Sequence, residues 1–389
     1  MHSEHARRQV KRRSLNSMAV LHERVSCELM VTNACNMRCD YCIARKVPGL
    51  AMTRGIGRKA LDMFVVLAEG AKSIEITLTG GEPLIEFTIL EELASHAKRR
   101  ACEAGMELSL VLKTNGTILT PAIMAFMQSQ CSKVVISIDG TLGPHDLHRR
   151  SVRGTGTHDV VSQNLSALLD NGVPCIASLT IHPDASRIVP DNVRYLHGLG
   201  VTQIDVGPAY GTVAWDHAAS RALVQSLWQV ALYMREVNRG GVRLEVGPLY
   251  RQSEHVGQKL YDSWGCHAGS TNLAFLPNGQ IAGCSALAMI ASTFPEMILG
   301  DVSSGLDDRA VERLLRLAQA ATPDRPRCQM CPTAADCAGG CLAINYSTTG
   351  LPLTPPDFYC QTISMIPPAW QFAWGDSVPN VAGDMHPRR

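Results

Sequence analysis

Residues 157–181, THDVVSQNLSALLDNGVPCIASLTI, contain a change from helical to strand periodicity. Their first half carries apolar residues at helical spacing: Val161, Leu165, Leu168 and Leu169. Thr157 is placed to cap the start of this helix and Gly172 to end it. Residues 174–181 then form a β-branched apolar run. The segment predicts a helix followed by a buried strand.

Similar apolar runs recur between residues 27 and 207, each followed by a helical pattern. They are CELMVT (27–32), IEITLT (74–79), LSLVLKT (108–114), VVISI (134–138), PCIASLTI (174–181) and TQIDVG (202–207). Nearly continuous apolar runs are typical of parallel strands buried on both faces. Six βα units predict the α/β class, as a partial (β/α)6 TIM-like barrel with its chemistry at the carboxyl ends of the strands.

The composition excludes several classes of partner. The chain has 389 residues, 46% of them hydrophobic, and its 36 basic and 35 acidic residues leave a net charge of +1. Such a balance provides no field that would gather nucleic acid or an acidic membrane surface. No run approaches the roughly 20 apolar residues of a membrane span, so we expect a cytoplasmic protein.

Composition shifts along the chain predict four parts. We expect a basic N-terminal tail at 1–24, the barrel at 25–239, a cysteine-rich domain at 240–365 and a loose C-terminal tail at 366–389. The basic tail is read as solvated, with a dock for an acidic partner as the alternative. In the cysteine-rich part, NLAFLPNGQIAGC predicts a hairpin that turns at Asn278-Gly279.

Cysteine is unusually frequent and unevenly placed. Of 14 cysteines, three lie in CNMRCDYC, from Cys35 to Cys42, and seven follow residue 265. Disulfides are rare in reducing compartments, so this density favours metal binding or catalysis. The scattered cysteines are read as small hydrophobic residues: Cys27, Cys102, Cys131 and Cys175. By itself the opening motif also fits a structural metal site with a distant fourth ligand.

The opening motif resembles the signature of the radical S-adenosylmethionine (SAM) enzymes, CxxxCxxC with an aromatic residue before the last cysteine. The resemblance implies that Cys35, Cys39 and Cys42 hold three irons of a [4Fe-4S] cluster, beside Tyr41. The fourth iron would then bind SAM, since a cluster short of one protein ligand leaves room for a cofactor.

Further motifs follow the next predicted strands. In ITLTGGEPL the resemblance implies that the Gly-Gly-Glu element receives the SAM amino group, because glycine allows close approach and a carboxylate suits an ammonium. It also implies a SAM pocket and a bidentate arginine contact to the SAM carboxylate. The implied residues are Gly80, Gly81, Glu82, Asn115, Ser137, Asp139 and Arg149. Each polar residue could instead only form hydrogen bonds that stabilise its own loop.

The later cysteines resemble the seven-cysteine pattern of the SPASM domain, which holds two auxiliary [4Fe-4S] clusters. The resemblance implies an outer set of Cys328, Cys331, Cys337 and Cys360, and an inner set of Cys266, Cys284 and Cys341. The inner cluster then has an open iron or a ligand other than cysteine, such as His267. Three clusters would contain about eleven to twelve irons. The competing interpretation is a zinc ribbon.

The resemblance implies reductive cleavage of SAM to a 5′-deoxyadenosyl radical, which abstracts a hydrogen from the substrate. SPASM enzymes mainly modify peptides, so we expect a cross-link in a ribosomally made precursor peptide. The alternatives are a small-molecule substrate such as a sugar or nucleoside, sulfatase maturation, and a non-enzymatic electron carrier. Sulfatase maturation is disfavoured by Ser285, which stands where those maturases carry an aspartate, and by a missing cysteine between residues 266 and 284.

Two protein partners are expected, a flavodoxin or ferredoxin-type reductant and a possible separate protein that recognises the leader peptide. The separate recognition protein is expected because the first strand begins near residue 27, which leaves no room for an N-terminal recognition domain. No acid or base is assigned beyond the SAM cluster. Asp205 and Tyr210, near the end of the sixth strand, are noted without a function.

Overall fold

The computed structural model describes residues 23–46, 49–249, 266, 268–318, 325–331, 333–337 and 339–374. Within them, eleven strands form one sheet in the order β11-β10-β9-β8-β1-β2-β3-β4-β5-β6-β7. The strands are β1 Arg24–Thr32, β2 Ser73–Gly80, β3 Glu107–Thr114, β4 Lys133–Ser137, β5 Cys175–Ile181, β6 Gln203–Pro208, β7 Glu245–Gly247, β8 Asn272–Phe275, β9 Gln280–Ala282, β10 Ile298–Asp301 and β11 Gly305–Leu306. Neighbours from β1 to β7 are parallel.

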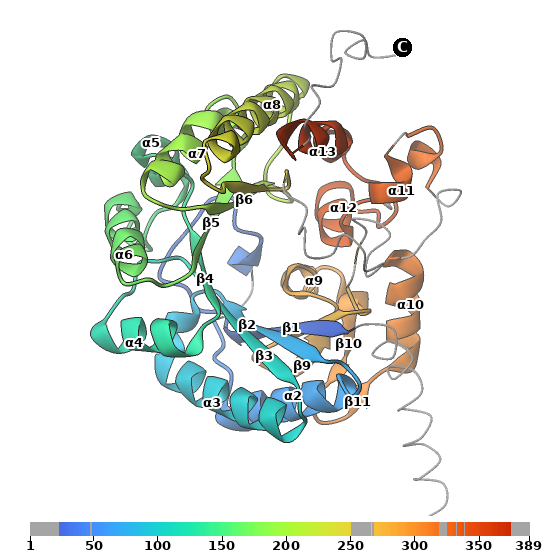
Figure 1. The fold of residues 1–389 in the computed structure, drawn as a ribbon. Coiled ribbons are helices and arrows are strands. Elements are labelled where there is room, and N and C mark those ends of the chain that lie inside the picture. The colour runs from blue at the N-terminus through green and yellow to red at the C-terminus, as the bar shows by residue number, and fades with distance from the viewer. Residues whose placement is uncertain are drawn as a thin grey trace, which may run out of the picture.

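Helices cover the outer side of the curved parallel strands (Figure 1). They are α2 Arg54–Leu67, α3 Phe87–Glu103, α4 Pro121–Gln130, α5 Leu142–His148, α6 His158–Asp170, α7 Val189–Gly198 and α8 His217–Arg239. This arrangement confirms the predicted α/β partial barrel. A seventh parallel strand, β7, extends it beyond the six expected, because a three-residue strand is too short to show as an apolar run.

The helix-to-strand unit at 157–181 forms as α6 and β5, but its cap differs from the prediction. Thr157 precedes α6 without a capping bond from its side chain. Instead, the Asp146 Oδ1 atom accepts the backbone N–H groups of Thr157 and His158, each at 2.8 Å. Because Asp146 comes from the preceding helix, α5, the local pattern could not show this contact.

The strands are not uniformly buried on both faces, as their apolar character predicted. Val111, Val135 and Ile176 form a small apolar cluster of their own, apart from the main core beneath the helices. Two residues further along the same strands come Lys113, Ser137 and Ser178, which line a cavity. The side chains of one face therefore change from apolar to polar toward the strand ends.

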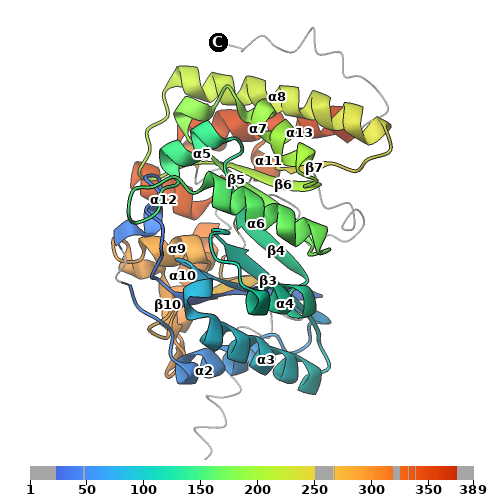
Figure 2. The same cartoon turned by 90° about the vertical axis from the view of Figure 1, so that its left-hand side faces the viewer.

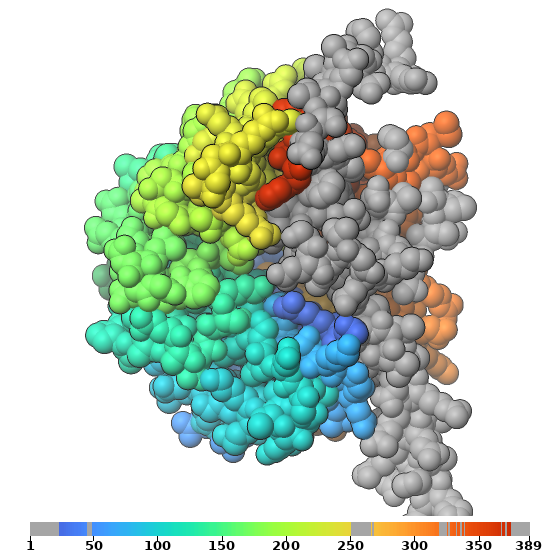
Figure 3. All heavy atoms as spheres, in the orientation of Figure 1, coloured from blue at the N-terminus to red at the C-terminus, as the bar shows by residue number. Residues whose placement is uncertain are grey.

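The C-terminal part joins the barrel sheet instead of forming a separate one. β8 pairs in parallel with β1 over Ser26–Leu29, and β9, β10 and β11 continue the sheet antiparallel. This pairing covers the edge that β1 would otherwise expose. The expected hairpin forms between β8 and β9, with Gly279 at φ +91°. Orange and red elements of this part thus lie beside the barrel in the ribbon and space-filling views (Figures 1 and 3).

Among its described residues, this part has five α-helices: α9 Ser285–Ile290, α10 Asp308–Ala318, α11 Ala334–Cys337, α12 Leu342–Thr349 and α13 Asp357–Trp374. α13 packs along α8 (Figure 2), and the Arg235 Nη1 atom donates to the Phe372 carbonyl at 3.0 Å. The chain therefore stays helical past residue 366, where the loose tail was expected to begin. Residues 1–22 and 375–389 lie outside the described residues. Among the described helices, none combines the length and apolar character needed to cross a bilayer.

Candidate functional site

A cavity of about 520 Å³ opens at the carboxyl ends of the parallel strands. The loop after β1 brings the three cysteines of CNMRCDYC to it. Most residues predicted for the site line this cavity: Cys35, Cys39, Cys42, Tyr41, Gly80, Gly81, Asn115, Ser137 and Arg149. Segments that are far apart in the sequence therefore meet at one place. The structure thus brings together the cysteine loop and the motifs that follow β2, β3, β4 and α5.

The two glycines let the end of β2 touch the cysteine loop. The Gly81 N–H donates to the Thr32 carbonyl at 2.7 Å, and the Glu82 N–H donates to the Ala34 carbonyl at 2.9 Å. A Cβ atom on Gly81 would lie 2.3 Å from the Ala34 oxygen, and Gly80 has φ +141°. Only glycine fits so close an approach. The Gly-Gly pair therefore sets the position of the loop that carries Cys35.

Gly81→Ala is expected to displace this loop, because its new methyl group overlaps a backbone carbonyl that cannot move alone. Misplacement of about 1 Å can cost on the order of 100-fold in rate. We expect deoxyadenosine formation to fall by that order, measured by chromatography after reduction with dithionite. Gly143→Ala is the matched control, since no atom lies within 4 Å of its added Cβ. Equal rates in the two variants would contradict this role of Gly81.

The Glu82 carboxylate lies behind the cavity wall. Its side chain is fully buried, and it accepts hydrogen bonds from the Leu84 N–H at 3.0 Å, the Thr114 hydroxyl at 2.8 Å and the Asn115 N–H at 2.7 Å. Burial raises the pKa of this carboxyl, and the three hydrogen bonds oppose the rise. Glu82 thus ties the turn after β2 to the end of β3, while Gly80 and Gly81 face the cavity.

Asn115 links the end of β3 to the cysteine loop. Its Nδ2 atom donates to the Asn36 Oδ1 atom at 2.8 Å and lies 3.8 Å from the Cys35 sulfur. Its own Oδ1 atom accepts the N–H and the hydroxyl of Thr117. The Met37 N–H lies 3.4 Å from the same Cys35 sulfur. Donors directed at a sulfur are one means by which proteins tune iron–sulfur clusters.

A buried ion pair holds the arginine of the site. The Arg149 Nε atom lies 3.0 Å from the Asp139 Oδ2 atom, and both side chains are less than one-tenth exposed. Asp139 also accepts the Tyr41 hydroxyl and, at 2.9 Å, the Thr180 N–H. Burial is the largest single influence and opposes the cation, but Asp139, Tyr41 and Cys39 together raise the pKa of Arg149. Arg149 lines the cavity, whereas Asp139 is not among the lining residues.

Two charged residues that the sequence motifs did not assign, Lys113 and Asp205, line the cavity. The Lys113 Nζ atom lies 3.2 Å from the Glu28 Oε1 atom, and Glu28 also accepts the N–H and hydroxyl of Ser285 at 2.7 and 2.8 Å. The Asp205 side chain has no hydrogen bond or ion pair with another described residue, and the residue is exposed. Desolvation by the surrounding atoms nevertheless raises the pKa of its carboxyl, against the opposing Lys113 and Lys133. A charged residue inside an apolar strand run is the signal that could have found Lys113, whereas Asp205 was noted from the sequence without a function.

Several of the later cysteines lie near one another in the described part of the chain, and their division into an outer and an inner cluster set stays a prediction. Burial raises the pKa of Cys360 to about 11, and the neighbouring thiols of Cys337, Cys328 and Cys331 add to the rise. Similarly, Cys341 and Cys266 lie close enough to Cys284 to raise its pKa further, after burial. Each set therefore offers thiol ligands from one region of the fold. His267, the suggested extra ligand, lies outside the described residues.

Two tyrosines border these sets. Burial is the largest cause that raises the pKa of Tyr210, followed by Cys341 and Cys284 of the inner set; Cys42 of the opening loop contributes less. Tyr210 also lines the cavity. Burial likewise dominates at Tyr359, which neighbours cysteines of both later sets. Tyr210 thus lies in the region where the opening loop approaches the inner set.

Residues 29–207 match the family model of the radical SAM superfamily. This part of the chain is a radical SAM domain. The fold of this domain implies SAM and [4Fe-4S] cofactors, and the cysteine thiols of the opening loop are suitable ligands for an iron–sulfur cluster. Cys35, Cys39 and Cys42 offer three thiols on one loop, and burial raises the pKa of Cys39 to about 11. A thiol of such pKa is protonated at neutral pH and loses its proton on binding iron.

Curated relatives share this domain. GTP 3′,8-cyclase of Rhodopseudomonas palustris is 28% identical over 186 residues, 46% of this chain and 51% of that protein. The serine-type anaerobic sulfatase-maturating enzyme of Klebsiella aerogenes is 23% identical over 324 residues, 80% of this chain and 77% of that protein. The chain covers only part of the first curated relatives that it matches: 59% of the length of one, and 51% of the length of the Rhodopseudomonas palustris cyclase.

Solved structures resemble the radical SAM domain together with the C-terminal part. Native anSMEcpe with bound AdoMet and the Kp18Cys peptide has a TM-score of 0.75 at 16% identity, covering 90% of this chain and 99% of that one. Streptococcus suis SuiB bound to precursor peptide SuiA has a TM-score of 0.61 at 16% identity, covering 91% and 79%. Both extend the likeness of fold into the cysteine-rich region, as predicted for a SPASM-type enzyme.

Proposed function

We propose that this protein is a radical SAM enzyme that reductively cleaves SAM and abstracts a hydrogen from a ribosomally made peptide, installing a cross-link. The observation that carries the proposal is the shared cavity of the Cys35–Cys42 loop, the Gly80-Gly81 turn and Arg149. When bound, the cluster and SAM supply a 5′-deoxyadenosyl radical for hydrogen abstraction. The two later thiol sets would hold two further [4Fe-4S] clusters.

The residues of the chain have distinct parts in this proposal. The Gly80-Gly81 backbone offers close approach to the SAM amino group, and Arg149, held by Asp139 and Tyr41, faces the SAM carboxylate. Asn115 and Ser137 border the same cavity. Asp205, a cavity carboxylate whose side chain makes no hydrogen bond or ion pair with a described residue although Lys113 acts on its charge, is placed to accept a proton or bind an amine of the substrate. Its raised pKa suits exchange of a proton with a bound group.

A peptide substrate is supported by the fold neighbours, which are bound to the Kp18Cys peptide and to SuiA. A second candidate, sulfatase maturation, is favoured by the 324-residue match to the Klebsiella aerogenes enzyme. Against it, Ser285 stands where those maturases carry an aspartate. In this structure Ser285 donates both its N–H and its hydroxyl to Glu28, so the position supports Glu28 instead of offering a carboxylate.

The testing experiment measures 5′-deoxyadenosine after dithionite reduction of iron-loaded protein with SAM. A radical SAM enzyme forms it, whereas an electron carrier forms none. Short precursor peptides encoded beside the gene are then added, and mass spectrometry follows the peptide. A cross-link removes two hydrogens and leaves two side chains joined after proteolysis, while formylglycine appears as a single aldehyde. Fully iron-loaded protein that forms no deoxyadenosine would refute the proposal.

A further inference from the structure

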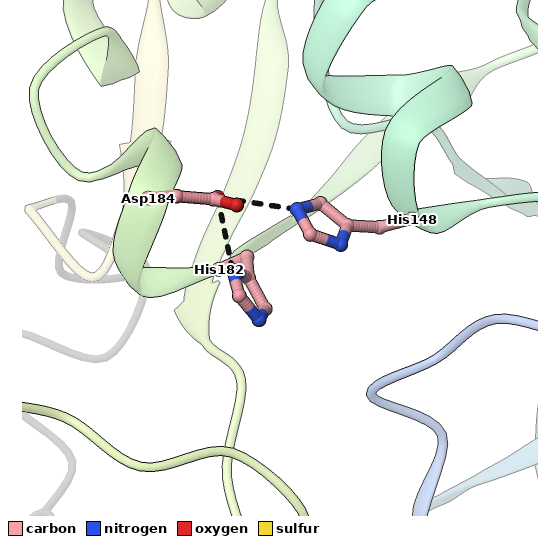
Figure 4. Close-up of side chains that lie close together, drawn as sticks. All are labelled: His148, His182 and Asp184. Carbon is pink, nitrogen blue, oxygen red and sulfur yellow. Dashed lines mark hydrogen bonds and ion pairs between the residues drawn. The ribbon is translucent and has the colours of Figure 1, made fainter.

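Two imidazoles and a carboxylate converge beside the SAM cavity (Figure 4). His148 ends α5, while His182 and Asp184 follow β5 at η3 Pro183–Ala185. The ligand atoms of the three residues all lie within 4.8 Å of one another. The Asp184 Oδ1 atom lies 3.1 Å from the His148 Nε2 atom and 2.9 Å from the His182 Nδ1 atom. The catalytic proposal uses none of these three side chains.

These separations match the spacing of ligands around a metal ion. Nitrogen and oxygen ligands at about 2.0–2.2 Å from a tetrahedral ion lie about 3.3 Å from each other. The observed 2.9 and 3.1 Å separations need only small shifts to admit an ion. Two histidines and one carboxylate are the donor set of three-ligand zinc sites and of non-haem ferrous sites.

The position of His148 is already held by a further carboxylate. Its Nδ1 atom lies 2.8 Å from the Asp40 Oδ2 atom, and its side chain is 6% exposed. A carboxylate behind the second nitrogen is the usual orienting partner of a metal-binding histidine. The ring of His148 also stacks on that of His182, with 4.0 Å between centroids. Asp40 and the stacking together aim the Nε2 atom of His148 at Asp184.

The convergence point faces open space. A pocket of about 540 Å³ is lined by Asp40, His182, Asp184 and the segment from Thr212 to Ala219. A three-ligand site with one side open leaves a position for water or a substrate group. Asp216, on the facing wall, uses its Oδ1 atom to cap α8 through the Ala219 N–H at 2.7 Å. Among the described residues, the three whose ligand atoms lie within 4.8 Å of one another are the two histidines and Asp184.

We propose that His148, His182 and Asp184 bind one divalent first-row metal ion, of the zinc or ferrous class, with Asp40 as the positioning residue for His148. The ion replaces two protons that now point at Asp184. The proton of His148 Nε2 is released to solvent, and the proton of His182 Nδ1 moves to the Nε2 atom of the same ring, the other tautomer. This nitrogen and oxygen site differs chemically from all three thiol sets. Because Asp40 lies between Cys39 and Cys42, the ion would also connect the cysteine loop to the end of β5.

Zinc binding to the iron-loaded protein tests the proposal without any turnover of SAM. Zinc sulfate is added, excess ion is removed by desalting, and zinc and iron are counted by plasma mass spectrometry. We expect one zinc per wild-type chain, lost in His182→Ala and in Asp184→Asn while iron stays constant. Zinc-edge X-ray absorption should show ligands at about 2.0–2.1 Å and no sulfur at about 2.3 Å.

His96→Ala is the matched control, because the His96 Nε2 atom also faces an aspartate, Asp62, at 2.8 Å, but belongs to no three-ligand group among the described residues. It should retain the zinc. Asp40→Asn should weaken zinc binding by about 10- to 100-fold, as loss of an orienting carboxylate does. Equal zinc in wild type and His182→Ala, or sulfur ligands in the absorption spectrum, would overturn the site. Neither result bears on SAM cleavage, so the proposed function is tested separately.

Discussion

Cys39→Ala is expected to abolish 5′-deoxyadenosine formation while leaving the iron of the C-terminal part in place. Cys39 is one of three thiols that the opening loop brings to the cavity, and no described residue there replaces its sulfur. Loss of one thiolate leaves two protein ligands for the cluster. We expect about four of the eleven to twelve irons to be lost, by the stoichiometry of cubane clusters.

Two variants control this result. Cys337→Ala should have the opposite pattern of iron loss. It should lose the iron of the outer set and form no product, while the cysteines of the opening loop remain in place. Cys102→Ala removes an exposed thiol of α3 that belongs to neither group, and should retain both iron and activity. Iron analysis and chromatography of the quenched reaction separate the three outcomes. Wild-type deoxyadenosine formation by Cys39→Ala would show that the loop does not hold the SAM cluster.

Arg149→Met is expected to destabilise the protein by about 3–5 kcal/mol, the usual cost of removing one partner of a buried ion pair. Asp139, 3% exposed, would keep its bonds from Tyr41 and Thr180 but lose its cation. SAM binding should weaken as well, because Arg149 lines the cavity. Urea unfolding followed by circular dichroism measures the first effect, and equilibrium dialysis of labelled SAM measures the second.

The double variant Arg149→Met with Asp139→Asn distinguishes stability from binding. Without the buried negative charge, much of the lost stability should return, yet SAM binding should stay weak. Arg153→Met, on the exposed loop after α5, is the control and should unfold like the wild type. Unfolding of Arg149→Met at the urea concentration of Arg153→Met would contradict the assigned pairing.

The barrel was predictable because its signals are local. Each strand from β1 to β6 is an apolar run within one short segment, and each covering helix shows its own period. Gly-Gly at residues 80–81 was recognisable from the resemblance and from its place after a predicted strand, because most adjacent glycines by themselves only mark turns. The division of the later cysteines into two sets came from the resemblance to the SPASM domain, and it stays a prediction.

Other features depended on partners distant in the sequence. β8 pairs with β1 across almost 250 residues, which no local pattern could show. Glu28 accepts from Ser285, 257 positions away, and thereby orients the wall beside Lys113. Likewise, Glu82 and Asp139 follow the expected strands, but their hydrogen-bond donors hold them behind the cavity wall. Their parts in SAM binding stay predictions.

The sequence by itself determined the fold class, because periodicity is a property of single segments, while the grouping of the cysteines was implied by the resemblance. The tertiary structure decided which polar atoms reach the cavity, which serve as supports, and that His148 meets His182 and Asp184. Those outcomes depend on burial and on hydrogen-bond partners from other segments. Such partners exist only once the chain has folded.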